Sequence, residues 1–525
     1  MITTIITKNT TKTILSGAKK LYEAVSTTMG PRGSNVIFRK HGAKVAVTHD
    51  GVTVAKAVSL GEGAEDVGAD LLREAAMKLD TTTGDGTTTV TVLAYHMLKA
   101  ALQEIESGKN PMKLKLSLDK DQVQVLDAIK KHTKEAGEEE IIQVAQVASG
   151  DKEIGQEVGE LVNKVGKDTP IFLEMGEASE TTQEVINGFK IYSGSASPYL
   201  LDESGVRHEA REVNVIVVDA KLRDKDDIMP ILKLIGSLEP TNRKILLVAN
   251  EVAGDALSLC LVNTAKGFGD IMVVKTPQTI KNSTDYLTDL AIATGGILLS
   301  RNGSHPIDKI SPAHMGYAKR VIVELTETTI IEGIPDSELL ETHRATLEKL
   351  VETATNAEVK KFAEDRLQTL GQKIAIIRIG GQSQSEIEEK HFRYEDAVGA
   401  AKAAARGGVV PGGGTLFYEL SHSVKNPILK AALKAPIKKI YENAGIELND
   451  YMNDIRAGYG LDVMNPDKGV INLINQGIID PAESEEQCIR TAVAISGLLM
   501  TSGAIIVDEK KTENETELET SFNQA

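Results

Sequence analysis

Apolar residues recur at the spacing of an amphipathic helix through most of the first third of the chain. The pattern predicts helices over residues 11–29 and 66–79, and a further helix that begins near Val90. Short apolar runs at residues 35–38 and 45–48 predict two strands. This part of the chain is therefore expected to be mainly helical.

The pattern changes after about residue 134, where glycines and short strand-like runs alternate. From about residue 189 to residue 371, long apolar runs such as VNVIVVDA and KILLVAN are separated by amphipathic segments. Apolar runs of this length are typical of buried strands, and the segments between them predict covering helices. We therefore predict a compact α/β domain inserted into a helical chain.

The chain returns to helical spacing beyond the inserted domain. A strand is predicted at residues 373–380, and an alanine-rich helix follows it and ends at Arg406. The uncharged run from Thr491 to Val507 predicts a buried helix rather than a membrane span, because serine, threonine and glycine interrupt it. Residues 510–525 are polar and predicted to be disordered.

Two predicted helices of the inserted domain carry apolar stripes wider than one buried face requires. Packing in the core is the default interpretation of such stripes. An exposed apolar groove for promiscuous binding is the alternative, since aliphatic and methionine side chains adapt to varied partners. The stripes comprise Ile228, Met229, Ile231, Leu232, Ile235 and Leu238 in the first helix, and Ala256, Leu257, Cys260, Leu261 and Val262 in the second.

Composition narrows the class of protein. A chain of 525 residues is expected to form roughly three domains of about 150 residues each. The net charge of −16 argues against nucleic acid and anionic membranes as default partners. Cys260 and Cys488 are too few for a disulfide framework, and the first twenty residues lack the apolar region of a secretory signal, so we expect a cytoplasmic protein.

The strongest candidate for chemistry is the Gly-Asp-Gly-Thr-Thr-Thr stretch at residues 84–89. Its glycines would let backbone N–H groups approach anionic oxygens, Asp85 could hold a divalent cation, and the positive end of the following helix would face the anion. A polar turn that merely caps a helix is the alternative. Residues 30–33, the Asp50-Gly51 turn and the triple glycine at residues 412–414 are further loop candidates, and Asp50 alone could be a simple turn residue.

Several familiar catalytic motifs do not occur in the sequence. The chain contains no GxxxxGK[ST] motif, no HExxH, no GxSxG and no Cys/His cluster of zinc spacing. Phosphate chemistry would therefore have to be built from aspartates, glycines and hydroxyl groups.

Five segments together resemble, in order and spacing, the nucleotide-binding motifs of the group I chaperonins, the GroEL type: TTMGPRGSNV, THDGVTVAKAV, GDGTTTVTVLA, YEDAVGAAKAAARGGVVPGGG and QGIIDP. The resemblance covers essentially the whole chain. It implies a multidomain α/β and α fold in three parts. These are a helical equatorial ATP-binding domain (residues 1–132 and 407–525), a small hinge-like intermediate domain (133–187 and 372–406) and an inserted α/β apical domain (188–371).

The resemblance also implies a nucleotide site for ATP with Mg²⁺ and an associated K⁺. Asp85 would bind the metal, and Asp50 and Asp396 would be the two catalytic carboxylates. Because Asp396 would lie in the intermediate domain, hinge closure would be needed to bring it to the nucleotide. The other implied nucleotide contacts are Thr28, Met29, Gly30, Pro31, Gly86, Thr87, Thr88, Thr89, Gly413 and Asp480.

The same resemblance implies the partners. Non-native polypeptides and the mobile loop of a co-chaperonin ring of the GroES type would bind the apical stripes, and subunits would form a homo-oligomer of two stacked seven-membered rings. The implied binding residues are Tyr199, Leu200, Met229, Leu232, Leu257, Leu261 and Val262.

Several positions depart from the pattern of the family. His49 stands where a lysine usually precedes the catalytic aspartate, and residues 464–466 differ beside the expected adenine site. Ser195 and Lys233 differ in the apical groove, and Gln372 replaces a hinge glycine. These departures favour a diverged paralogue.

Two functions of different class follow from these patterns. The first is an ATP-hydrolysing folding machine, and the second is a non-cycling holdase or scaffold that keeps the fold. The retained Asp50, Asp85 and Asp396 favour the first, since a chain released from catalysis has no physical need for three aspartates in these settings. A generic phosphotransferase is a third, weaker possibility, because no acceptor site is apparent.

Overall fold

The computed structural model describes residues 2–6, 9–39, 45–61, 63–176, 178–202, 205–277, 282–301, 303–354, 357–371 and 373–509. Gln372 and the polar segment 510–525 lie outside these residues. The chain forms two compact units. The first comprises Met1–Asp168, Leu173–Thr181 and Arg378–Ala525, and the second comprises Thr169–Phe172 and Thr182–Ile377.

The prediction of a multidomain α/β and α fold is confirmed. The second unit covers the predicted α/β insertion. The first unit holds the segments expected to form the equatorial domain and most of the expected intermediate domain, although residues 169–172, 182–187 and 373–377 fall in the second unit. The division of the first unit into two domains stays a prediction.

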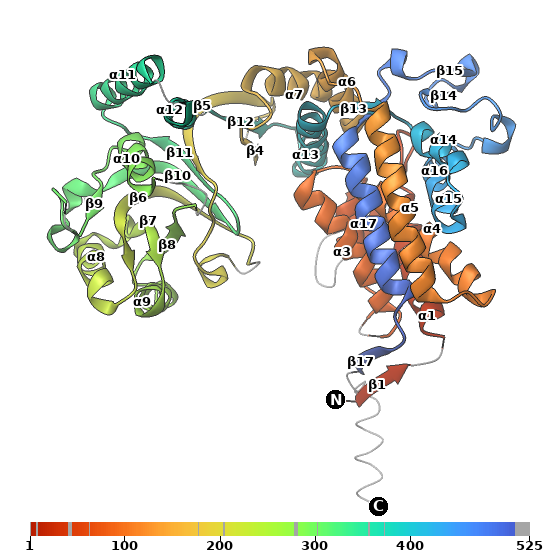
Figure 1. The fold of residues 1–525 in the computed structure, drawn as a ribbon, viewed down its shortest axis with the longest axis horizontal. Helices are drawn as coiled ribbons and strands as arrows, with labels where there is room; N and C mark the ends of the chain where they lie inside the picture. Colours follow the sequence, from red (N-terminus) through yellow and green to blue (C-terminus); the bar gives the residue numbers. More distant parts are fainter. Residues whose placement is uncertain are drawn as a thin grey trace, which may run out of the picture. The chain divides into compact units, whose positions relative to one another are not determined.

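The first unit is mainly helical (Figure 1). Its small strands pair in antiparallel twos: β1 with β17, β2 with β3, β13 with β16 and β14 with β15. The helices are α1 Thr10–Ser26, α2 Gly51–Ala57, α3 Asp66–Thr82, α4 Thr87–Glu106, α5 Pro111–His132, α6 Glu138–Ser149, α7 Lys152–Val165, α13 Gln384–Gly407, α14 Thr415–Ser423, α15 Pro427–Leu433, α16 Ala435–Asn443 and α17 Ala482–Met500. The strands are β1 Ile2–Ile6, β2 Val36–Arg39, β3 Val45–Thr48, β13 Val409–Pro411, β14 Tyr459–Leu461, β15 Val470–Asn472, β16 Ile479–Pro481 and β17 Ile505–Glu509.

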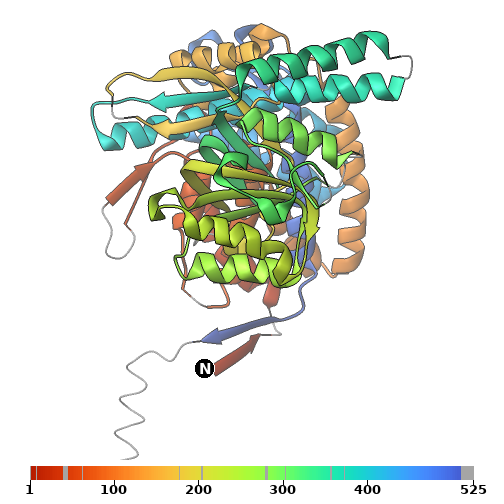
Figure 2. The same ribbon diagram turned by 90° about the vertical axis from the view of Figure 1, so that its left-hand side faces the viewer.

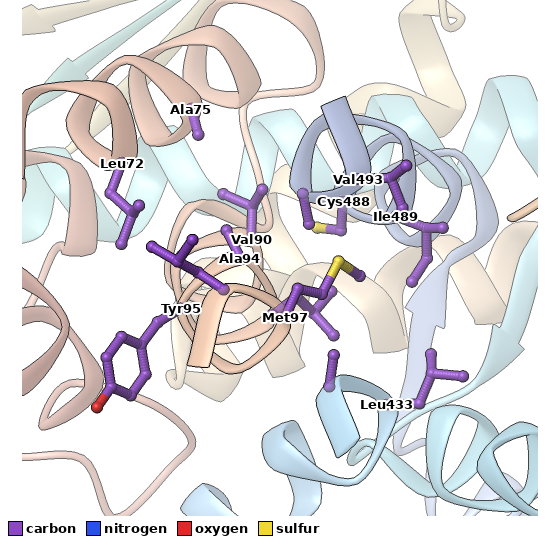
Figure 3. Close-up of a cluster of buried hydrophobic side chains, with 14 of the residues drawn as sticks. Leu72, Ala75, Val90, Ala94, Tyr95, Met97, Leu433, Cys488, Ile489 and Val493 are labelled. Atoms are coloured by element: carbon purple, nitrogen blue, oxygen red, sulfur yellow. The ribbon is translucent and has the colours of Figure 1, made fainter. Parts of the chain in front are cut away.

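Helix α4 forms the centre of this unit. Its residues from Val90 to Tyr95 are buried without interruption, so it is covered on all sides rather than along one stripe. Figure 3 shows Val90, Ala94 and Met97 of α4 among side chains of α3, α15 and α17. Packing on every side holds α4 in place, and the loop at its N-terminus is therefore held in place as well.

One predicted helix is divided in the structure. The uncharged run from Thr491 to Val507 was expected to form a single buried helix, but α17 ends at Met500 and β17 begins at Ile505. The apolar residues Ile505 and Ile506 pair with Ile6 and Ile5 of β1, so pairing with a strand distant in sequence overrides the helical pattern. Within the described ranges, no helix has the length and apolar character needed to cross a membrane.

The second unit is built on a nine-stranded sheet with the order β4-β12-β5-β11-β10-β6-β7-β8, and β9 also pairs with β6. The chain passes between the units within β4 and β12. The strands are β4 Ile171–Met175, β5 Thr182–Ile191, β6 Arg207–Leu222, β7 Lys244–Val252, β8 Asp270–Lys275, β9 Leu299–Ser300, β10 Gly316–Glu324, β11 Thr328–Gly333 and β12 Lys373–Ile379. The helices are α8 Lys225–Ser237, α9 Gly254–Ala265, α10 Ser283–Thr294, α11 Ser337–Thr353 and α12 Ala357–Leu370.

Strand β6 separates the two cores of this unit. Ile216 and Val218 pack with residues of α8 and α9, whereas Val215 and Val217 pack with residues of α10. This alternation follows from the two-residue period of a strand. Helices α11 and α12 lie side by side as a hairpin (Figure 2).

Candidate nucleotide site

The N-termini of helices α2 and α4 meet in the first unit. A Cβ on Gly51, the first residue of α2, would lie 2.3 Å from Thr88 Oγ1, so the absence of a side chain at Gly51 allows the two helix ends to approach this closely. Thr28 Oγ1 is 3.4 Å from Thr88 Oγ1, which brings the end of α1 to the same place. Residues far apart in sequence thus surround the start of α4.

The loop before α4 has the backbone of an anion site. Gly84 and Gly86 adopt positive φ angles of 64° and 83°. A Cβ on Gly86 would lie 2.7 Å from Cys488 Sγ on α17, so this glycine is required by both conformation and space. No side chain caps α4 in the described part of the chain, and the N–H groups of its first turn have no intrahelical acceptor. Such an end attracts anions.

Asp50 caps helix α2. Its Oδ1 accepts a hydrogen bond from the Val52 N–H at 3.0 Å, and its Oδ2 accepts one from the Thr53 N–H at 2.8 Å. The side chain is buried, as the residue is only 7% exposed. Asp50 therefore does act as a turn and cap residue, which was one of the roles that the sequence allowed. Because a carboxylate oxygen accepts more than one hydrogen bond, capping also orients Asp50 without using all of its acceptors.

Asp396 lies near the other two aspartates within the first unit. Burial and the negative charges of Asp50 and Asp85 raise the pKa of Asp396 well above its ordinary value, with smaller contributions from Glu395 and Asp80. The sequence suggested that a hinge would have to close to bring Asp396 in. Whatever movement ATP binding requires of α13, hinge closure onto a bound nucleotide stays a prediction.

Asp85 faces the start of α17. Burial raises the pKa of Asp85, and the nearby Ser484 side chain and Gly86 backbone oppose the shift. Among the described residues, no group of three or more His, Cys, Asp or Glu side chains could hold a metal ion by itself. Mg²⁺ characteristically binds through one or two carboxylates together with substrate phosphates, and a single Asp85 beside an anion site fits that requirement.

The triple glycine at residues 412–414 and Asp480 lie together on another side of the candidate site. Strands β13 and β16 pair so that Val410 lies opposite Asp480. A Cβ on Gly412 would lie 3.0 Å from Asp480 Oδ1, and Gly413 has a φ of 66°. Burial and the charge of Asp85 raise the pKa of Asp480 to about 7, although its hydrogen bond from the Gly413 backbone opposes this shift.

The predicted wall at residues 28–31 needs a correction. Met29 is only 6% exposed and packs on Val92 and Ala435, so its side chain is part of a small core. Asn443 Nδ2 donates to the Met29 carbonyl at 2.9 Å. Pro31 is exposed and Gly30 has a φ of 80°. Any ligand contact at Met29 would therefore come from its backbone.

His49 does not replace the charge of the lysine expected there. Burial and Arg393 lower its pKa, and this outweighs the opposing effects of Glu389 and Asp50. Its Nδ1 lies 3.9 Å from Glu389 Oε1. The imidazole is therefore neutral at pH 7, and Asp50 has no cation at the preceding position.

Sequence reasoning missed several residues of this site. Ser484 and Glu485 follow Asp480 by one helical turn, and Glu485 Oε2 is buried without a hydrogen-bond partner among the described residues. The acidic first turn of α17, directly after Asp480-Pro481, was the available signal. Gly399 was also missed, although a glycine inside an alanine-rich helix indicates close backbone approach.

The predicted apolar surface of the second unit is only partly exposed. Tyr199 and Val262 are 88% and 47% exposed, and Met229, Leu257 and Leu261 are partly buried. Leu200 and Leu232 were expected to bind polypeptides, but at 5% and 7% exposure they belong to the core. The reason is that α8 turns Leu232 inward together with the other buried residues of its stripe.

Comparison with known proteins gives consistent results. A model of the TCP-1/cpn60 chaperonin family matches residues 21–510. Two crystal structures of the chaperonin gp146 from the bacteriophage EL 2 (Pseudomonas aeruginosa), both in the presence of ATP-BeFx, have similar folds at 22% identity. Crystal form II aligns with a TM-score of 0.68 over 97% of this chain and 100% of that chain. Crystal form I aligns with a TM-score of 0.62 over 96% and 99%.

Proposed function

Because the chain belongs to the TCP-1/cpn60 chaperonin family, we propose that it is an ATP-driven chaperonin that binds non-native polypeptides and assists their folding in the cytoplasm. The crystallisation of the similar phage chaperonin with ATP-BeFx supports the choice of nucleotide. The observation that carries the proposal is that the start of α2 and helix α13 both contact the region of the uncapped N-terminus of α4. The charges of Asp50 and Asp85 also act on Asp396, since they help to raise its pKa.

In this proposal the nucleotide phosphates bind the N–H groups and hydroxyls at residues 87–89, where the helix end favours negative charge. Asp85 would hold Mg²⁺, which would supply positive charge to neutralise the phosphates. Asp480, held against the backbone of residues 412–413, accepts hydrogen bonds from the ribose hydroxyls. The glycines keep the backbone close to the ligand on both sides.

Hydrolysis would use the remaining two carboxylates. Asp50 is oriented by its own helix cap and accepts a hydrogen bond from the attacking water. Asp396 removes a proton from that water as the bond from oxygen to the terminal phosphorus forms and the bond to ADP breaks. A pKa raised above the ordinary carboxyl value makes Asp396 a better proton acceptor than a solvated aspartate.

Polypeptide capture would occur at the exposed Tyr199 and Val262, together with the partly buried Met229, Leu257 and Leu261 beside them. Apolar side chains bind unfolded segments without sequence preference, since the driving force is burial of surface. We further propose a ring-forming homo-oligomer, with a co-chaperonin ring as an additional partner of the same helices. A double seven-membered ring is the arrangement that the family resemblance implies.

Steady-state ATP hydrolysis with Mg²⁺ and K⁺ tests the proposal. Asp396→Ala should lower kcat by about 10²–10⁴-fold, the usual contribution of a general base. Glu388→Ala, at an exposed position of the same helix, is the matched control and should retain the wild-type rate. Equal phosphate release from wild type and Asp396→Ala would sink the hydrolytic assignment.

The holdase alternative predicts a different pair of results. A wild-type protein that suppresses aggregation of a denatured enzyme, yet releases no phosphate with Mg²⁺ and K⁺ present, would favour it. Native mass spectrometry at micromolar concentration with ATP adds a second criterion, because a monomer would argue against a ring-forming chaperonin.

A further inference from the structure

Gly84, in the loop before α4, and Gly399, in helix α13, are in direct backbone contact. A Cβ on Gly399 would lie 2.3 Å from the Gly84 carbonyl oxygen and 2.9 Å from Gly84 Cα. A Cβ on Gly84 would in turn lie 3.0 Å from Gly399 Cα. All of these neighbours are backbone atoms, so no side-chain rotation could make room for a larger residue at position 399.

The loop cannot easily move away from α13 at this contact, because hydrogen bonds hold it in place. The Gly84 N–H donates to the carbonyls of Leu79 and Asp80 at 3.2 and 3.1 Å, at the end of α3. Thr83 is buried, and its Oγ1 donates to the Asp85 carbonyl at 2.9 Å. Any added volume at Gly399 must therefore move α13 rather than the loop.

Upstream of Gly399, helix α13 is held by hydrogen bonds to α6 and α7. Tyr394 Oη donates to Glu157 Oε2 of α7 at 2.7 Å, and Arg393 Nη1 donates to the Ser149 carbonyl of α6 at 2.9 Å. Asp396 lies between these anchors and Gly399. Since residues three apart share one face of a helix, the face that meets the loop at Gly399 also presents Asp396 to it.

We infer that Gly399 is a positioning residue for hydrolysis, whose missing side chain lets α13 rest on the loop before α4 and thereby holds Asp396, one turn away on the same face, toward that loop. The inference rests on the proposed ATPase function. A Cβ at position 399 separates α13 from the loop, and a displacement of about 1 Å at a reacting group can cost about 10²-fold in rate. ATP binding depends on the loop and on α4, which this change leaves in place.

The test compares Gly399→Ala with Gly63→Ala, a glycine where a Cβ would meet nothing within 4 Å. Gly399→Ala should lower kcat at least about 10-fold while the dissociation constant of a fluorescent ATP analogue stays within about 3-fold, as expected when only the transition-state geometry is lost. Gly63→Ala should change neither. An unchanged kcat for Gly399→Ala overturns the inference.

Two further measurements keep the outcomes distinct. Tyr394→Phe removes the hydrogen bond to Glu157 without adding volume, and it should lower kcat several-fold even if Gly399→Ala does not fold. Hydrogen exchange of segment 394–400 should rise in Gly399→Ala, and unchanged exchange there would overturn the importance of the contact whether or not ATP is hydrolysed. If Asp396→Ala loses activity while Gly399→Ala and Tyr394→Phe keep the wild-type rate, only the positioning role of Gly399 is refuted. If the wild-type protein hydrolyses no ATP, the proposed function itself is refuted.

Discussion

The glycine loop at residues 84–89 of the first unit and the apolar stripes of the second unit were both predicted from local sequence patterns, but the residues named in the two predictions are arranged differently in the structure. Around α4, the glycines, hydroxyls and carboxylates named from the sequence lie together. On α8 and at Leu200, residues named for an exposed surface are buried. A backbone conformation such as positive φ is a property of a few residues, whereas exposure depends on what the rest of the chain covers.

Among the variants that compare these two regions, the largest effect is expected in the glycine loop at residues 84–89. Asp85→Ala removes the proposed metal ligand and should lower ATP turnover by about 10²–10³-fold, comparable to the loss of one preorganised electrostatic group. Asp119→Ala, at an exposed position of α5, is the matched control for a change of charge. Turnover is measured across a Mg²⁺ titration. A wild-type rate at saturating Mg²⁺ would show that the metal binds elsewhere.

The next effect separates buried from exposed residues within one helix. Leu232→Ala should lower the free energy of unfolding of the second unit by about 2–5 kcal/mol, because it leaves a cavity under α8. Its exposed neighbour Lys233→Ala should stay within about 0.5 kcal/mol. Chemical unfolding followed by circular dichroism measures both. If Leu232→Ala were as stable as Lys233→Ala, Leu232 would not be a core residue and would again be a candidate for the binding surface.

A smaller effect is expected from the exposed part of the stripes. Val262→Ser should leave stability almost unchanged and weaken capture of a chemically denatured enzyme, because it removes apolar surface that solvent already reaches. Val206→Ser is the control, since Val206 is 54% exposed but outside the predicted surface. Light scattering during dilution of the denatured enzyme gives the comparison. Equal loss of capture in both variants would contradict a localised binding surface.

The smallest effect is a pH dependence of the nucleotide-free protein. Burial and neighbouring charge raise the pKa of Asp480 to about 7, above that of a solvated aspartate. Because the folded state then holds its proton more tightly than the unfolded state, stability falls as pH rises from about 4 to about 7. Glu485→Gln removes one of the two buried acids and should make this fall shallower. Thermal unfolding at intervals of pH measures it, and parallel curves for both proteins would rule out the coupling.

The site was predictable from sequence where its geometry is local. Gly86 needs a positive φ before α4, and Asp50 caps the helix that follows it, so the surrounding residues alone specify both. Ser484, Glu485 and Gly399 were missed because their roles arise from contacts with α4 and the loop, which lie far from them in sequence. Met29 was predicted to end a helix and to contact the nucleotide, but it follows the end of α1 and its side chain packs in the core with Val92.

The sequence by itself determined the helical and α/β regions, the turn glycines and the family to which the chain belongs. These features depend on periodicity and backbone preference, which are properties of residues close together in sequence. Only the tertiary structure decided that Leu232 is buried, that the run after Met500 becomes a strand paired with β1, and that Gly399 meets Gly84. The physical reason is that burial, strand pairing and close backbone approach are set by partners distant in sequence, whose packing overrides local preference.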